Sequence, residues 1–206
     1  MPERVPEPPA DQAPPATTRL ARLRRSPATS GLLLSLGLVY LATLASPGLL
    51  ESLAKVDEGI RRGELWRLVT ASFVHAGLVH LAVNGFALSV IGPTVESLYG
   101  PWAFILFFLG GGAVGFAVSS VFVAQTSLGA SAGLFALLGV LLGFALRARG
   151  LLLPAARRAM IREILTVAFL NLAFGLAVGF IDNAAHLGGF AGGLALGLVV
   201  RPRRPR

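Results

Sequence analysis

Residues 97–146 read SLYGPWAFILFFLGGGAVGFAVSSVFVAQTSLGASAGLFALLGVLLGFAL, a stretch without aspartate, glutamate, lysine or arginine. The hydrocarbon core of a membrane is about 30 Å thick, and one helix crosses it with about 20 residues. The stretch is therefore about twice as long as one span. It predicts two consecutive transmembrane helices, joined by the uncharged residues 125–130.

The rest of the chain is also apolar. Hydrophobic residues make up 54% of the 206 residues and charged residues 14%, which leaves too little polar surface for a soluble domain. We predict an all-α polytopic membrane protein, a bundle of six transmembrane helices with a long outer loop, residues 51–77, between the first two. The six predicted spans are residues 31–50, 78–95, 102–124, 131–146, 164–180 and 184–200.

The two ends of the chain lie outside this bundle. Residues 1–26, rich in proline and arginine, are predicted to form a disordered cytoplasmic tail, residues 27–200 the membrane domain and residues 201–206 a basic cytoplasmic tail. Arginines gather before the first span, between the fourth and fifth, and after the sixth, so with six spans they share one side, and both termini are predicted to be cytoplasmic. This sidedness explains the net charge of +8. The expected partner is the lipid bilayer, not nucleic acid.

Polar side chains recur where three spans are predicted to begin on the outer side. His80 lies near the start of the second span, Ser131 starts the fourth and His186 lies near the start of the sixth. Buried polar groups in a bilayer are costly and usually face the bundle interior or a water-filled cavity. We therefore expect these three side chains to meet in a pocket that opens outward.

The chemistry of these residues suggests a reaction. A serine hydroxyl becomes a good nucleophile when a base takes its proton, and histidine suits that role near neutral pH, so Ser131 and His186 are predicted to form a dyad. His80 and Asn84 share one helix face and carry N–H donors, which with the Ser131 amide are predicted to stabilise an oxyanion. The chain has no cysteine, which excludes thiol catalysis. No metal or cofactor is expected.

Each of these signals is weak alone. A G-x-S-x-G string such as residues 129–133 arises readily by chance in a chain with 25 glycines. Small residues in the fourth and sixth spans also suit helix packing in lipid, and a lone intramembrane histidine suits packing or a proton relay. The nucleophile elbow of soluble α/β-hydrolases is excluded, because it needs a strand-turn-helix context.

Five motifs taken together resemble those of the rhomboid intramembrane serine proteases, in the same order and with similar spacing. They are Glu64-Leu-Trp66-Arg67, His75 followed by His80-x-x-x-Asn84, Glu96-x-x-x-Gly100, Gly129-x-Ser131 and His186-x-x-Gly189-x-x-x-Gly193. The resemblance covers about residues 61–200. It implies a six-helix bundle, a Ser-His dyad without a third carboxylate, and cleavage of transmembrane protein substrates.

The resemblance also implies individual roles. Ser131 would be the nucleophile and His186 the general base, with His80 and Asn84 in the oxyanion site. The residues implied to support the structure are Trp66 and Arg67 at the membrane interface, Glu96 as an anchor of the second helix, Phe135 beside the catalytic histidine, and Gly129 and Gly189 of the motifs. One departure from the family pattern is Ala132, which follows the nucleophile where glycine is usual.

The predicted function is that of an intramembrane serine endopeptidase, a hydrolase that cleaves single-pass transmembrane proteins near the outer membrane face through an acyl-enzyme. The predominance of arginine over lysine favours a bacterial source, and hence the plasma membrane. One alternative is a weak or inactive rhomboid-like protein that binds transmembrane helices, although such a protein would normally have lost Ser131 or His186. Another is a small transporter, which would carry its polar residues nearer the midplane and show internal repeats.

Overall fold

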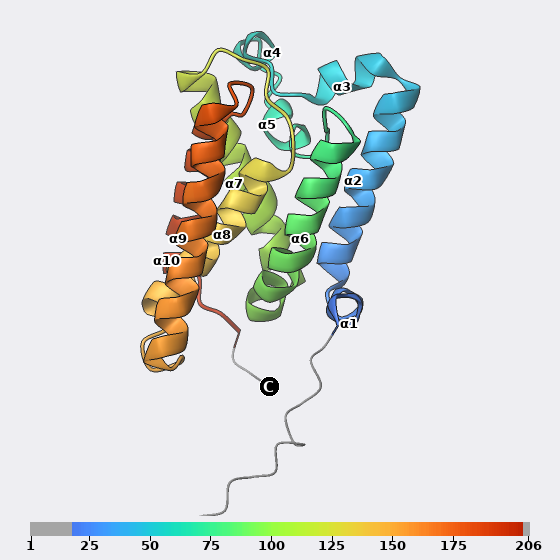
Figure 1. Cartoon of the computed structure of the whole chain (residues 1–206). Coiled ribbons are helices and arrows are strands. Elements are labelled where there is room, and N and C mark those ends of the chain that lie inside the picture. Colours follow the sequence, from blue (N-terminus) through green and yellow to red (C-terminus); the bar gives the residue numbers. More distant parts are fainter. Residues whose placement is uncertain (1–17, 204–206) are drawn as a thin grey trace, which may run out of the picture.

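The computed structural model describes residues 18–203, which form ten helices and contain no strand (Figure 1). The predicted terminal tails fall mainly outside the described residues, at 1–17 and 204–206. The helices are α1 (Arg19–Arg24), α2 (Pro27–Ala45), α3 (Pro47–Leu53), α4 (Asp57–Arg61), α5 (Arg67–Thr70), α6 (Leu78–Tyr99), α7 (Pro101–Phe122), α8 (Ser131–Arg147), α9 (Pro154–Ala177) and α10 (Asn183–Val199).

Helix length and composition agree with a membrane bundle. Four helices, α2, α6, α7 and α9, are long and apolar enough to cross a membrane. The helices α8 and α10 are apolar but have 17 residues each, or about 25 Å at 1.5 Å per residue. The predicted all-helical polytopic class is confirmed, whereas the count of six spans stays a prediction.

Helix α8 is the centre of the bundle. All of its residues from 132 to 145 are buried, and it contacts α6, α7, α9 and α10. A helix that is apolar all round can be buried on every side. Its first residue is Ser131, so the predicted nucleophile stands at one end of the most enclosed helix.

Close approach of α8 and α10 depends on glycine. Three glycines of α10 face backbone carbonyl oxygens of α8, where a Cβ atom would collide with the oxygen. The pairs, glycine first, are Gly189 with Ala132, Gly193 with Ala136 and Gly197 with Val140. Small residues let helix backbones approach closely in membranes. This glycine ladder, Gly189, Gly193 and Gly197, therefore fixes the position of α10 against α8.

The first predicted span needs two corrections. It was expected at residues 31–50, but α2 begins at Pro27, a residue that suits the first helical position, and ends at Ala45. Ser46 is extended (φ −139°, ψ 92°) because it precedes a proline, which disfavours the helical region, and α3 follows as a separate helix. Within the predicted N-terminal tail, α1 forms a short helix whose N-terminal end is capped by the Thr18 hydroxyl.

Glu96, the expected anchor of the second membrane helix, joins α6 to the start of α2. Its Oε1 accepts the Ala28 N–H at 3.0 Å, and its Oε2 accepts the Thr29 N–H at 2.8 Å and the Thr29 hydroxyl at 2.7 Å. The first N–H groups of a helix have no partner within the helix, and a carboxylate there also interacts favourably with the helix dipole. The buried Glu96 carboxylate therefore acts as the cap of α2.

We expect Glu96→Gln to lower the stability of the protein by about 1–3 kcal/mol, because the amide turns an NH₂ group toward donors and leaves a buried N–H or hydroxyl unpaired. Thermal unfolding in detergent measures the change. Glu163→Gln on the exposed face of α9 is the matched control and should melt like the wild type. Equal melting temperatures for the two variants would contradict the capping role.

The outer loop between α2 and α6 is braced by Arg67. Its Nε binds the Glu64 carboxylate at 2.5 Å, and its Nη1 donates to the carbonyl oxygens of Glu51 (2.6 Å) and Ala54 (2.9 Å). The preceding Trp66 side chain is 54% exposed, as suits an aromatic ring at a membrane interface. Arg67 thus holds the loop together through hydrogen bonds, while the neighbouring Trp66 presents an exposed ring.

Lys55, the single lysine of the chain, is fully buried in the same loop. Its Nζ donates to the carbonyl oxygens of Val123 (3.1 Å) and Gln125 (2.9 Å) and pairs with the Asp57 carboxylate at 2.7 Å. Its backbone pairs with Ser127 through two hydrogen bonds, of 2.9 and 3.0 Å. Lys55 therefore fastens the outer loop to the segment that leads into α8.

Candidate active site

The structure brings Ser131 and His186 together. His186 Nε2 lies 2.8 Å from Ser131 Oγ, although the two residues are 55 positions apart in the sequence. Each stands in the first turn of its helix, α8 or α10, and the glycine ladder aligns these helices. The distance is within the hydrogen-bonding range of a nucleophile and its base.

Phe135 orients the imidazole. Its ring stacks on that of His186 with centroids 4.3 Å apart and planes 8° from parallel. Phe135 lies one helical turn after Ser131, so the same face of α8 carries the hydroxyl and the ring that supports the histidine. Stacking restricts rotation of the imidazole and keeps Nε2 directed at Ser131.

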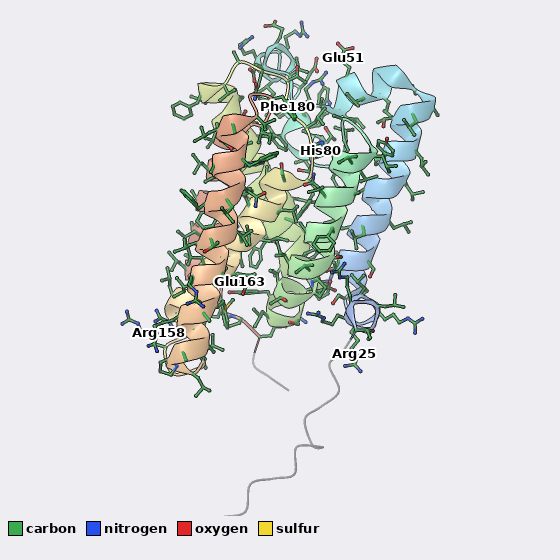
Figure 2. The ribbon with its side chains drawn as sticks, viewed as in Figure 1. Arg25, Glu51, His80, Arg158, Glu163 and Phe180 are labelled. Atoms are coloured by element: carbon green, nitrogen blue, oxygen red, sulfur yellow. The ribbon has the colours of Figure 1, made fainter. Side chains whose placement is uncertain are left out.

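His80 lies beside the turn that precedes the nucleophile. Gly129 in this turn has φ +117°, which favours glycine, and a Cβ there would lie 2.7 Å from Cε1 and Nε2 of the His80 ring. The Gly129 N–H donates to the Ala71 carbonyl at 2.8 Å. Gly129 therefore allows the turn and the ring to be neighbours, and His80 lies close to the turn that leads into Ser131 (Figure 2).

His75 contacts the same turn. Its Nε2 accepts the Ala130 N–H at 3.4 Å, and its ring centroid lies 5.0 Å from that of His80. Burial, together with the charge of His80, lowers the pKa of His75 to about 4. The ring is therefore neutral at neutral pH, as an acceptor must be.

Asn84 is buried one turn after His80, but its amide is engaged within its own helix. Its Nδ2 donates to the His80 carbonyl at 2.9 Å. Within residues 18–203 no hydrogen bond joins this amide to Ser131. The NH₂ group has a second hydrogen, so one donor is left for a ligand.

Ala132, the departure from the family pattern, is buried. Its side chain belongs to a small apolar cluster with Ala71, Phe116 and Ala185. The extra methyl group is thus accommodated by packing, and the helix starts at Ser131 with φ/ψ that need no glycine. The N–H of Ser131 is at the first helical position, where a helix offers no acceptor.

Sequence reasoning missed an acidic residue near the dyad. Asp182 is the N-cap of α10: its Oδ1 accepts the Ala185 N–H at 2.9 Å, and its Oδ2 accepts the hydroxyls of Ser119 and Ser127. An aspartate just before an apolar helix is an N-cap signal that could have located it. Nothing in the sequence pattern pointed to the two serines.

The chain resembles known proteins over most of its length. The rhomboid domain model matches residues 62–203. Rhomboid protease GluP of Bacillus subtilis (strain 168) is 42% identical over 149 residues, 70% of this chain and 29% of that protein. RHOMBOID-like protein 6, mitochondrial, of Arabidopsis thaliana is 32% identical over 158 residues, 75% of this chain and 50% of that protein. RHOMBOID-like protein 1 of the same plant is 35% identical over 159 residues, which are 75% of this chain and 40% of that protein. The chain thus spans half or less of the length of these relatives.

Proposed function

The chain belongs to the rhomboid family, and on this premise we propose that it is an intramembrane serine endopeptidase that cleaves single-pass transmembrane proteins near the outer membrane face. The observation that carries the proposal is the 2.8 Å contact between Ser131 Oγ and His186 Nε2. A fold by itself does not determine a function, so we argue the activity from the residues of this site.

The proposed reaction is acyl transfer. His186 Nε2 takes the proton of Ser131 while Oγ attacks the peptide carbonyl, and the tetrahedral intermediate collapses to an acyl-enzyme as His186 protonates the leaving amine. Water, deprotonated by His186, then releases the acyl group and regenerates the serine. A transmembrane helix hides its carbonyls in hydrogen bonds, so the substrate must unwind locally before attack.

The negative oxygen of the intermediate needs donors. Three candidate donors are the N–H of Ser131, the ring of His80 and the second hydrogen of the Asn84 amide. The first is supported by the helix start and the second by the contact of His80 with Gly129. Asn84 would turn toward the oxyanion when substrate binds, since active-site hydrogen bonds often tighten only in the complex.

The test is covalent labelling and cleavage. Wild-type protein in proteoliposomes should react with a fluorophosphonate and cut a single-pass model substrate, and Ser131→Ala should do neither. Thermal unfolding shows whether both proteins are folded. A folded wild type that neither labels nor cleaves a panel of substrates would refute the proposal and favour a protein that binds transmembrane helices without cutting them.

Removing an oxyanion donor should slow turnover without preventing folding. We expect His80→Ala and Asn84→Ala each to lower kcat on the order of 10²–10³-fold with a small effect on KM. Asn171→Ala in α9 is a matched control, because Asn171 also donates to the carbonyl four residues earlier, at 2.8 Å, and is exposed. Unchanged kcat in both site variants would remove these residues from the oxyanion role.

We propose that the protein lies in a bacterial plasma membrane with both termini cytoplasmic. Arg25 and Arg158 lie at the end of the bundle where α1 is found, and Glu51 and Phe180 lie at the opposite end (Figure 2). The arginine-rich end fits the cytoplasmic side. Because the chain has no cysteine, Glu51→Cys and Arg158→Cys are single labelling sites. In intact cells an impermeant maleimide should label only the Glu51→Cys variant. Labelling of the Arg158→Cys variant alone would show that the orientation is the opposite of the one proposed.

A further inference from the structure

The Asp182 carboxylate joins three separate parts of the chain. Oδ1 caps α10 through the Ala185 N–H, and Oδ2 accepts one hydroxyl from Ser119 on α7 and one from Ser127 in the segment before α8. Ser119 is fully buried, and Ser127 is 5% exposed. The residues Asp182, Ser119 and Ser127, which we name the carboxylate node, thus connect α7, α10 and the segment that leads to the nucleophile.

The position of the node relates it to the dyad. Asp182 precedes His186 by four residues, and Ser127 precedes Ser131 by four. The hydrogen bond between Asp182 and Ser127 therefore joins two residues that each precede a member of the dyad by four positions. It connects the residue that caps the helix of His186 to the segment that precedes Ser131.

Ser127 is also held from the opposite side. Its backbone N–H and carbonyl pair with the backbone of Lys55, whose Nζ binds two further carbonyls of the same segment. The segment between α7 and α8 is thus fixed by backbone bonds to Lys55 and by a side-chain bond to Asp182. Of these bonds, only the one from Ser127 to Asp182 connects the segment to α10.

Capping alone does not explain the node. A helix N-cap needs one acceptor, and asparagine or serine serves as well as aspartate. Here the second carboxylate oxygen accepts two hydroxyls from other elements, so both oxygens of the side chain accept hydrogen bonds. Asp182 is also distinct from the third member of a catalytic triad, because within residues 18–203 the His186 Nδ1 has no hydrogen-bond partner.

We propose that Asp182 is a positioning residue that sets the distance between His186 and Ser131 through its bond to Ser127. This inference rests on the proposed protease function and specifies how its dyad is kept in register. An error of about 1 Å in the placement of reacting groups lowers rates by about 10²-fold, so even a small shift of the segment is measurable.

The experiment compares Ser127→Ala, Ser119→Ala, Asp182→Asn and the double variant Asp182→Asn/Ser127→Ala in proteoliposomes. For each we would measure kcat and KM for a single-pass substrate, the rate constant of fluorophosphonate labelling, and thermal unfolding. Asp182→Asn keeps an acceptor for the cap, so the fold should persist. Ser119→Ala is the matched control, since it removes a buried hydroxyl from the same carboxylate but leaves the segment before α8 tied.

We expect Ser127→Ala and Asp182→Asn to lower kcat and the labelling rate about tenfold with KM unchanged, and the double variant to be little slower than either. Ser119→Ala should keep near wild-type kcat whatever it does to the melting temperature. Equal loss of kcat in the two serine variants, or additive losses in the double variant, would overturn the positioning role and leave a structural one.

The same data separate this inference from the proposed function. A folded wild type without labelling or cleavage refutes the protease itself. A wild type that labels and cleaves, together with Ser127→Ala and Asp182→Asn variants that do so at the same rate, refutes only the role of Asp182.

Discussion

Replacing His186 with alanine is expected to lower kcat on the order of 10⁶-fold, the loss seen when the histidine base of a serine protease is removed. The physical reason is that Ser131 then has no acceptor for its proton at 2.8 Å. Fluorophosphonate labelling should fall in parallel, because it depends on the same activated hydroxyl. Both are measured in proteoliposomes against the wild type.

Two controls separate chemistry from folding. The His186 ring is 7% exposed and stacks on Phe135, so its removal leaves a space, and thermal unfolding must show that the variant is folded. The double variant Ser131→Ala/His186→Ala should be no slower than either single variant, because residues that act as a unit are not additive. A further large drop in the double variant would mean that the two residues act independently.

Replacing Gly193 with valine is expected to abolish the folded bundle. A Cβ at this position would collide with the Ala136 carbonyl oxygen, which belongs to the backbone of the buried part of α8 and cannot move by a rotamer change. Overpacking of side chains already costs about 1–3 kcal/mol, and forcing two helix backbones apart costs more. We expect loss of the cooperative thermal transition in detergent and of fluorophosphonate labelling.

The control is a glycine on an open helix face. A Cβ at Gly37 of α2 meets nothing within 4 Å, so Gly37→Ala should unfold at or slightly above the wild-type temperature, since alanine favours a helix by about 1 kcal/mol. A Gly193→Val protein that melts and labels like the wild type would show that α8 and α10 do not depend on the glycine ladder.

The sequence was sufficient to predict the helical class and the candidate site, because both leave local or strongly patterned signals. Uncharged runs revealed the apolar helices, and the ordered motifs placed Ser131 and His186 at the starts of two of them. The break at Ser46 was not predicted, although the following proline disfavours helix at that residue. Hydropathy averages over a window and cannot register a single backbone interruption.

The node around Asp182 could not be predicted, because it is made of contacts between distant positions. Ser119 and Ser127 are 63 and 55 residues from Asp182, and an isolated serine carries no pattern. The same holds for Lys55, whose acceptors lie 68 and 70 residues away. Neutral His75 likewise acquires its role from burial and not from its neighbours in the sequence.

The burial of Lys55 has a practical consequence for handling the protein. It is the single lysine of the chain and has no exposed surface, so amine-directed reagents find no lysine side chain on the folded molecule. Crosslinkers, dyes or resins that couple through lysine would modify Lys55 only when the outer loop opens. Acylation of Lys55, followed by mass spectrometry, therefore measures how fast this loop separates from the segment before α8.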